Sequence, residues 1–581
     1  MTGNFFWQTD WKINNIMQFK KTLLRLSILF LPFQLSAQST NLPQGSKHSH
    51  FLDRLEIMMQ NNPDLNFSGL KPFSRRNAVK AAELADSLEN KYPYDYYFHF
   101  SKIDKYNFQS LQMNNQEWAS ADTNIYKSKK PLLGVFYKTK ANMLLVDEKD
   151  FFLAINPVLQ QNQSIETGSG QRIFLNSKGI TARGLIAKKI GFDFYVTDNQ
   201  ERTPLFVQGF EKKYRAVPGA GFYKPFKTTA YDYFDGRGSI YVNVAKYFNL
   251  QFGYDRNVIG NGYRSLLMSD FATNYLFLKI DTRIWKLNYT NIFMEIMPQY
   301  SLNQGNMLLP KKYAATHRLS VNATPWLNVG LFESVVFGRP NRFEFSYLNP
   351  VIFLRSAEQQ IGSPDNAFVG LDLKANIGHR GQFYGQLLID EFMLKQVRAR
   401  TGWWGNKYGI QLGGKAIDIF NIKNLDIQGE LNVVRPFTYS HYDVTANYSH
   451  YNQPLAHPLG SDFSEVTGIL KYQPKPKWLA QLKMIFFVQG VDTAGQNLGN
   501  NILLNYTSRP FDFGYSIPSG LKANGLNTSL LVSYELKENL FLDGSLLFRK
   551  YKVEGRSDLS YNTNLLTVGV RINMFRREYD Y

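Results

Sequence analysis

The sequence lacks cysteine, is poor in charge, and has no apolar run long enough for a membrane helix in its main part. Among its 581 residues the cysteine count is zero, which excludes a disulfide framework and any thiolate metal site. Beyond the N-terminal segment, no stretch reaches the roughly 18 consecutive apolar residues that a membrane helix needs. Charged residues make up 19% and hydrophobic residues 44%, so general disorder is also excluded.

A secretory signal peptide is the first feature that is present. In "MQFKKTLLRLSILFLPFQLSAQ", Lys20 and Lys21 precede an apolar core, and small residues at Ser36 and Ala37 form a cleavage site. The apolar core is too short to span a bilayer, which disfavours the alternative of a retained anchor helix. Residues 1–37 are therefore expected to be removed, with Met17 favoured as the true translation start. A lipoprotein anchor is excluded because no cysteine follows the cleavage site.

The next segment, residues 38–139, has the pattern of short helices. In "SRRNAVKAAELADSLE", Ser74 can cap a first turn, and alanines recur at helical spacing from Ala78 to Ala85. "SKIDKYNFQSLQMNNQEW" indicates a second helix. Because this region precedes the first strand, we expect residues 73–118 to lie on the periplasmic side of the membrane.

From about residue 140 the apolar period changes from helical to two. In "YFNLQFGYD", Phe248, Leu250, Phe252 and Tyr254 alternate with polar residues and glycine. In "LLTVGVRINMF", the apolar side chains run from Leu566 to Met574, with Arg571 and Asn573 on the other face. Such strands need lipid on one face and water on the other, since a strand buried on both faces would not carry charge.

The connections between these strands differ in length, which favours an outer-membrane barrel. Tight polar turns such as the one around 537–539 alternate with long loops such as "YSHYNQPLAHPLGSDFS". Aromatic residues reach 15%, as expected for the girdles at the two membrane interfaces. We expect an all-β fold, a transmembrane antiparallel barrel of about 16–18 strands over residues 140–581, with a small N-terminal helical region. A soluble β-sandwich is the alternative.

Two motifs could bind a metal or act as acid and base, but a structural role is the better interpretation of each. The histidines of "HSH" at His48–His50 could bind a metal, but they lie where flexible tails are usual. Asp390 and Glu391 are adjacent in a strand, so they point to opposite faces unless a bulge intervenes, and an ion pair with Arg398 or Arg400 is expected. We predict no catalytic residue, no metal site and no cofactor.

The stretch "RARTGWWGNKYG" is the strongest candidate for ligand binding. Trp403 and Trp404 lie between Arg400 and Lys407, so indole faces could stack on a sugar while the cations hold acidic groups. The alternative is an interface girdle followed by a turn. A formal net charge of +19 also favours acidic polysaccharide or lipid phosphates as partners. Nucleic acid, which an exported barrel rarely meets, is not expected.

A longer stretch resembles a known family. "HRLSVNATPWLNVGLFESVVFGRPNRFEFSYLNPVIFLRSAEQQIGSPDNAFVGLDLKANI" and the following "YGQLLIDEF" are similar to the capsule-assembly Wzi family, and within it to the gliding-bacterium, RemB-like branch. The matching positions are Glu333, Asn349-Pro350, Glu358, Gly362, Asp365-Asn366 and Asp390-Glu391. The resemblance implies an eighteen-stranded outer-membrane barrel that holds capsular polysaccharide as a lectin, and a part in gliding motility. It does not place the family's sugar-binding residues on this chain.

These observations predict a non-enzymatic outer-membrane barrel that binds or organises surface polysaccharide. Its expected partners are acidic surface polysaccharide, outer-membrane lipid with lipopolysaccharide, and gliding or secretion machinery. A porin-like transport channel is the main alternative. A lipid hydrolase is a third, but it needs a serine, a histidine and an acid together at the membrane edge, and no local pattern among the eight histidines nominates one.

Overall fold

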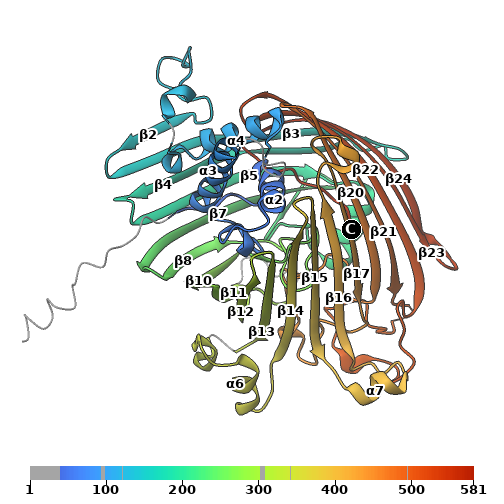
Figure 1. Ribbon diagram of the computed structural model, residues 1–581. Helices are drawn as coiled ribbons and strands as arrows, with labels where there is room; N and C mark the ends of the chain where they lie inside the picture. Colours follow the sequence, from blue (N-terminus) through green and yellow to red (C-terminus); the bar gives the residue numbers. More distant parts are fainter. Residues whose placement is uncertain (1–38, 93–98, 121, 301–307, 340–341, 494) are drawn as a thin grey trace, which may run out of the picture.

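The computed structural model describes residues 39–92, 99–120, 122–300, 308–339, 342–493 and 495–581. The expected signal peptide, residues 1–37, lies outside the described residues. Within them the chain closes into an antiparallel barrel of 18 strands (Figure 1), as the alternating pattern predicts. The last barrel strand pairs with the first, for example Arg571 opposite Gln160, so the sheet has no free edge.

The barrel strands follow chain order, each pairing with the next. They are β3 (Phe151–Glu166), β4 (Ile173–Ile186), β5 (Ile190–Arg202), β7 (Ala230–Ala245), β8 (Phe248–Asp255), β10 (Tyr275–Ile284), β11 (Leu287–Ile296), β12 (Lys312–Thr324), β13 (Leu327–Phe337), β14 (Asn366–Ile377), β15 (Gly381–Glu391), β16 (Lys407–Ala416), β17 (Leu425–Val434), β20 (Phe463–Lys475), β21 (Trp478–Val491), β22 (Leu521–Lys537), β23 (Leu540–Val553) and β24 (Arg556–Ile572).

Helices and short strands complete the structure. The α-helices are α2 (His48–Met59), α3 (Arg75–Lys91), α4 (Lys102–Asn114), α5 (Leu205–Tyr214), α6 (Leu354–Gln360) and α7 (Leu394–Ala399). Short strands are β1 (Leu70–Lys71), β2 (Leu144–Glu148), β6 (Lys224–Phe226), β9 (Val258–Ile259), β18 (Ser449–His450) and β19 (Gln453–Pro454). Single 3-10 turns occupy Leu65–Phe67, Gln116–Trp118, Thr123–Tyr126, Phe345–Leu348, Ile419–Asn421, Val444–Ala446 and Tyr506–Ser508. Among the helices described, none has the length and apolar character to cross a bilayer.

The two faces of the barrel wall carry different side chains. On β24, Leu566 and Val568 are 47% and 57% exposed on the outside, whereas Arg571 is buried on the inside and pairs with Asp543 at 2.9 Å. This confirms the predicted register. The expectation for Met574 is wrong, because β24 ends at Ile572 and Met574 is buried inside the barrel.

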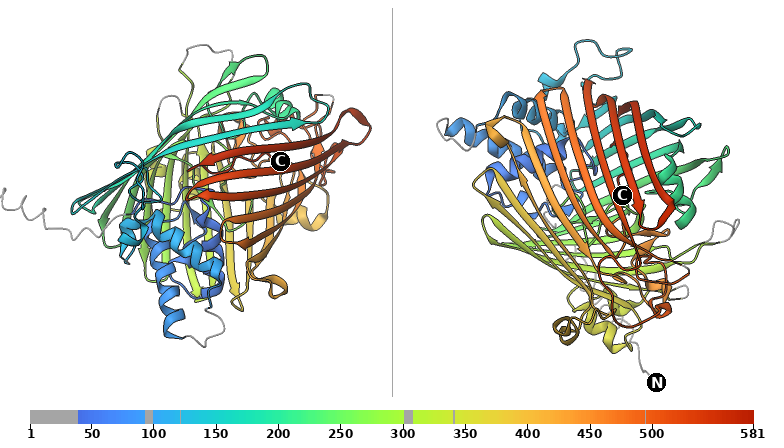
Figure 2. Two further views of the ribbon diagram at one scale, coloured as in Figure 1. Left: turned by 90° about the horizontal axis from the view of Figure 1, so that it is seen from above. Right: turned by 90° about the vertical axis from the view of Figure 1, so that its right-hand side faces the viewer.

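The two ends of the barrel differ as outer-membrane barrels do. Tight turns such as Lys475–Trp478 and Lys537–Leu540 join strands at one end, which we call the short-turn end. Most connections at the other end, the long-loop end, are longer, as at 203–229, 338–365, 435–462 and 492–520. Helices α2, α3 and α4 gather at the short-turn end, opposite α6 and α7 (Figures 1 and 2). In outer-membrane barrels the short turns face the periplasm and the long loops face outside.

The predicted helices form for the reasons that the sequence gives. The Ser74 side chain accepts a hydrogen bond from the Asn77 backbone N–H and so caps α3, and the alanines at Ala78, Ala81, Ala82 and Ala85 are all buried. Ser101 and Asp104 form a capping box at the start of α4. A third helix was not predicted, because "HSH" at its start was expected to lie in a flexible tail. That expectation is wrong, since His48 is the first residue of α2 and is buried.

One arginine fixes the helices to the barrel wall. Arg54 of α2 is 1% exposed and pairs with Asp104 of α4 at 3.1 Å. It also pairs with Asp418 and Asp426 in and after the turn that joins β16 to β17, at 3.0 and 2.5 Å. A charge this well buried is stable only when it is paired and hydrogen-bonded. Arg54 therefore joins two helices and the wall into one polar network.

Chain segments fill the lumen between the two ends. The β8–β10 connection descends from the long-loop end until β9 pairs with β1 of the N-terminal segment. The β17–β20 connection packs against it, with the Tyr439 and Tyr448 hydroxyls donating to the carbonyls of Leu266 and Leu267 at 2.8 and 2.7 Å. The tail after β24 also turns inward, where Asp580 pairs with Arg264 at 3.1 Å. The lumen thus has a packed core of its own.

Candidate functional site

The four residues predicted to bind sugar lie in and beside the β15–β16 connection at the long-loop end. Helix α7 ends at Ala399, and Arg400 follows it in the left-handed conformation with φ 53° and an exposed side chain. Arg398 and Lys395 of α7 are also exposed. In the described part of the chain none of these three cations makes an ion pair or hydrogen bond through its side chain. The connection therefore presents unneutralised positive charge to the outside.

The two tryptophans are half-buried and differ in their surroundings. The Trp404 ring lies 4.8 Å from the Tyr506 ring, and the Arg509 guanidinium stacks over it at 3.9 Å from the ring centre. One face of Trp404 is therefore already covered. The Trp403 ring closes over Gly405, where an added Cβ would meet ring atoms at 2.4 Å. Any side chain at position 405 would therefore displace this ring.

Lys407 is placed differently from the other three. It is completely buried, and its Nζ lies 3.0 Å from the carboxylates of both Asp390 and Glu391. The register shifts between Ile389 and Glu391, and this irregularity brings the two adjacent carboxylates to one lysine. The expectation that Arg398 or Arg400 pairs with these carboxylates is wrong. The charge of Lys407 is used within the protein, where it joins β15 to β16 below the tryptophans.

A second long connection completes this surface. The β21–β22 connection runs beside the β15–β16 connection through three backbone hydrogen bonds: Trp404 N to Asp512 O, Gly514 N to Thr401 O and Tyr515 N to Gly402 O. It adds the exposed rings of Phe511 and Phe513, which are 48% and 50% exposed. Sequence proximity does not reveal these residues, because they lie more than one hundred positions from the tryptophans. The only sequence signal was the aromatic content of a long loop.

We call the residues Arg400, Trp403, Trp404, Tyr442, Tyr506, Arg509, Phe511 and Phe513 the aromatic platform. The Tyr442 ring lies 6.3 Å from the Tyr506 ring, and His441 lies 5.9 Å from the same ring. Burial, together with the nearby Lys407 charge, lowers the pKa of His441 to about 4. His441 is therefore neutral at physiological pH. Arg509 pairs with Asp512 at 2.7 Å, so the unneutralised positive charge of the platform comes from Arg400.

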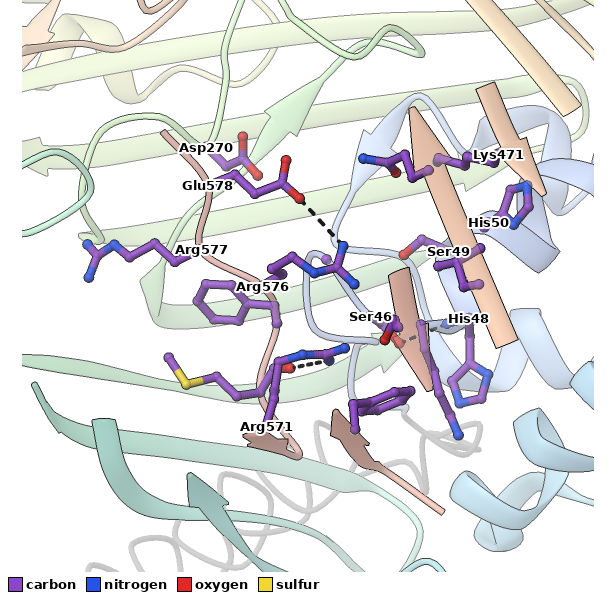
Figure 3. A pocket seen from close by; sticks show the side chains of 18 of the residues that line it. Ser46, His48, Ser49, His50, Asp270, Lys471, Arg571, Arg576, Arg577 and Glu578 are labelled. Atoms are coloured by element: carbon purple, nitrogen blue, oxygen red, sulfur yellow. Dashed lines mark hydrogen bonds and ion pairs between the residues drawn. The ribbon is translucent and has the colours of Figure 1, made fainter. Parts of the chain in front are cut away.

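A cavity at the short-turn end is the other candidate (Figure 3). It has a volume of about 480 Å³ and lies between the start of α2, the tail after β24 and strands β20–β23. Many of its charges are paired, as in Lys47 with Glu535 at 2.6 Å and Arg576 with Glu578 at 3.4 Å. Lys471 has no such partner in the described residues. Burial and the neighbouring cations Lys47 and Arg75 lower the pKa of His48, so it is neutral.

The described residues contain no cluster of three or more potential metal ligands from His, Cys, Asp and Glu. His48 and His50, the histidines considered for metal binding, lie in one helix, and His50 Nε2 bonds to Asp426 at 2.8 Å. His50 thus has a structural partner at the junction between helix and wall.

Comparisons with known proteins agree with the fold. Neither protein-family models nor curated protein sequences give a match. Among solved structures, the chain is similar to Wzi of Escherichia coli, described as an outer-membrane, carbohydrate-binding β-barrel involved in Group 1 capsule assembly. The identity is 14%, the TM-score is 0.54, and the match covers 93% of this chain and 100% of Wzi. OprD of Pseudomonas aeruginosa matches at 10% identity over 72% of this chain and 94% of its own, with a TM-score of 0.40. OpdK of the same organism, solved with vanillate, matches at 9% identity with the same TM-score, over 72% and 97% of the two chains.

The fold and its outer face define the class of protein. A closed 18-stranded barrel with an apolar outer face, short turns at one end and long loops at the other is an outer-membrane β-barrel. Its particular form has a filled lumen and a helical cap at the short-turn end. The chain as a whole is structurally similar to Wzi.

Proposed function

We propose that this barrel is a non-enzymatic protein that binds or organises acidic polysaccharide at the cell surface, through the aromatic platform. The observation that carries the proposal is the platform itself: aromatic rings from three connections at the long-loop end, with unpaired cations on one of them, the β15–β16 connection. Sugar rings stack on aromatic faces, and guanidinium groups bind carboxylates and phosphates. In this proposal Arg400 and Trp403 contact the glycan, while Trp404 and Lys407 hold the connection in position.

The filled lumen supports a binder over the alternative of a transport channel. A barrel of this strand number has room for an aqueous pathway unless something fills it. Here the β8–β10 and β17–β20 connections and the tail after β24 occupy the interior, and helices α2–α4 cover one end. We therefore expect purified protein in a planar bilayer to show little steady conductance. Large and steady conductance would favour the channel.

Binding is tested by the retention of acidic surface polysaccharide on cells that carry variants. Trp403→Ala removes the stacking face that the proposal assigns to the glycan and should weaken retention roughly tenfold at any salt concentration. The triple variant Arg400→Gln, Arg398→Gln and Lys395→Gln removes only charge. Its effect on retention should be large at low salt and small at physiological ionic strength, where salt screens charges that are more than about 8 Å apart. Trp285→Ala is the matched control, because Trp285 is 81% exposed in a turn at the opposite end.

Substitution of Lys407 tests its structural role separately from glycan binding. Since its charge is buried against two carboxylates, Lys407→Gln should lower the thermal stability of the barrel more than it changes the salt dependence of glycan retention. Unchanged retention in both the tryptophan and the arginine variants would contradict the proposal. A contribution to gliding motility is the further step that the sequence resemblance implies, and it is tested by the spreading of cells that carry the tryptophan variant.

A further inference from the structure

The lipid-facing wall of the barrel carries a row of polar side chains. Asn291, His317 and Glu333 lie opposite one another on β11, β12 and β13. They point outward, because the neighbouring Arg318 points inward and pairs with Asp372 at 2.6 Å. Polar and charged groups on the lipid face are costly, by about 2–4 kcal/mol for a cation near the midplane. A row of three therefore needs an explanation.

The β13–β14 connection folds over the outer wall and covers part of this row. Asn291 Nδ2 donates to the Pro350 carbonyl at 3.2 Å, and the Leu354 backbone N–H donates to Glu333 Oε2 at 2.9 Å. Apolar side chains of the wall, among them Val335, are buried beneath Leu354 and Tyr347. The connection thus acts as a cover that lies against the outside of the barrel.

Below this cover the wall holds an apolar groove of about 430 Å³. Its lining includes Leu331, Val351 and Phe353, which are 57%, 84% and 54% exposed. At the far end it reaches Ile284 and Leu287, next to the short turn between β10 and β11. The groove therefore runs from the polar row along the wall toward the short-turn end. Its position on the lipid face places it in contact with acyl chains.

His317 lines this groove with an unpartnered nitrogen. The side chain is 1% exposed, its Nδ1 lies 2.9 Å from Glu333 Oε1, and its Nε2 has no hydrogen-bond partner. A buried polar atom without a hydrogen-bond partner is costly, so Nε2 needs a partner that the described residues do not supply. With a proton on Nε2, the imidazole can donate to an acceptor such as a carbonyl oxygen.

We propose that the groove binds one acyl chain of a glycerophospholipid, with the ester carbonyl accepting a hydrogen bond from His317 Nε2. The chain fills the apolar length between the polar row and Ile284, and the ester supplies the acceptor that the protein does not. Two cations of the cover are paired, Arg339 with Asp365 at 2.7 Å and Arg355 with Glu358 at 2.5 Å. Arg342 is exposed on the same connection and has no ion pair among the described residues. A lipid with a single phosphate suits a rim with one unpaired cation better than the polyphosphorylated lipid of lipopolysaccharide.

The same geometry argues against hydrolysis of the bound lipid. A lipid hydrolase that uses a serine, a histidine and an acid needs a hydroxyl nucleophile within hydrogen-bond reach of the histidine. Among the described residues that line the groove there is no serine, and the hydroxyls of Thr282 and Tyr289 make no hydrogen bond to His317. The groove therefore has a histidine and an acid without the third member, which fits a binding site.

The test uses full-length protein in phosphatidylcholine vesicles that contain a phosphatidylcholine with a photoreactive group in its acyl chain. After illumination, peptide mass spectrometry should find labels concentrated on Leu331 and Val351–Phe353, relative to Leu546, which faces lipid on β23. Leu331→Trp, which fills the groove, should lower labelling of Val351–Phe353, and Leu546→Trp is the matched control. His317→Phe with Glu333→Gln removes the donor but keeps the acceptor for Leu354, and should lower labelling about fivefold, as one hydrogen bond predicts.

The possible results separate the proposal from its alternatives. Labelling that is equal at Leu331 and Leu546, and unchanged by Leu331→Trp, would mean ordinary exchange of surrounding lipid and would overturn the proposal. Displacement of the label by purified lipopolysaccharide, but not by unlabelled phosphatidylcholine, would overturn the choice of lipid. Stable heat-resistant barrels in both tryptophan variants show that lost labelling comes from the filled groove and not from unfolding.

Discussion

Replacing Arg54 by methionine should detach the helical cap from the barrel while leaving the wall intact. Methionine has a similar length and no charge, so the change removes the ion pairs and keeps most of the volume. Three carboxylates, of Asp104, Asp418 and Asp426, then remain in a buried site without their shared partner. The barrel strands keep their hydrogen bonds, because Arg54 lies in α2 and contributes none to the sheet.

The expected magnitude follows from burial. Removing one partner of a buried ion pair costs about 3–5 kcal/mol, mainly because the other charge stays buried and unpaired. An energy of that size multiplies the population of the detached cap by roughly a hundredfold to several thousandfold. By contrast, Lys105 of α4 is 53% exposed and pairs with Glu89 at 3.3 Å, and such a surface pair contributes about 0–1 kcal/mol.

Hydrogen–deuterium exchange of the purified barrel in detergent measures this opening directly. The amides of α2 should exchange far faster in Arg54→Met than in the wild type, whereas Lys105→Met, the matched control, should change them by less than about fivefold. Adding Asp426→Asn to Arg54→Met should recover part of the protection, because it removes one of the unpaired charges. Equal protection of α2 in Arg54→Met and Lys105→Met would refute the reasoning.

Three further predictions concern the tail and the wall. Burial raises the pKa of Asp580, but its pairing with Arg264 and Lys483 has the larger effect and holds this pKa well below the usual range. The ionised carboxylate therefore stabilises the docked tail fully above the ordinary pKa of about 3.9, and this stabilisation is lost as pH falls. Spin labels on the tail should therefore become mobile only in acid. Asp580→Asn should mobilise the tail at neutral pH. A wild-type tail that moved freely at neutral pH would contradict the role of these ion pairs. Cysteine introduced at Leu546 should react with a lipid-soluble thiol reagent and cysteine at Arg549 should not, since only the former faces lipid.

The sequence by itself determined the alternation of the strands and the class of fold. Apolar and polar side chains must face lipid and lumen in turn, so the pattern around Leu566 and Arg571 fixes which face of a strand each side chain takes, without knowledge of its neighbours. The cap of α3 at Ser74 is equally local, because a side-chain oxygen and a backbone N–H three residues on form it. Such features depend on residues that are close in the chain.

Only the tertiary structure decided which residues meet across the barrel and what fills it. Asp390 and Glu391 share Lys407, and not the nearer Arg398 or Arg400, because an irregular register aligns both carboxylates with the next strand. His317 and Glu333 become a pair on the lipid face through a strand register that brings positions sixteen residues apart into contact. The tail leaves the wall at Ile572 and enters the lumen because buried partners from other segments, Arg264 and Lys483, neutralise its carboxylates there. Periodicity describes the environment of each face, but contacts between distant segments depend on closure of the whole sheet.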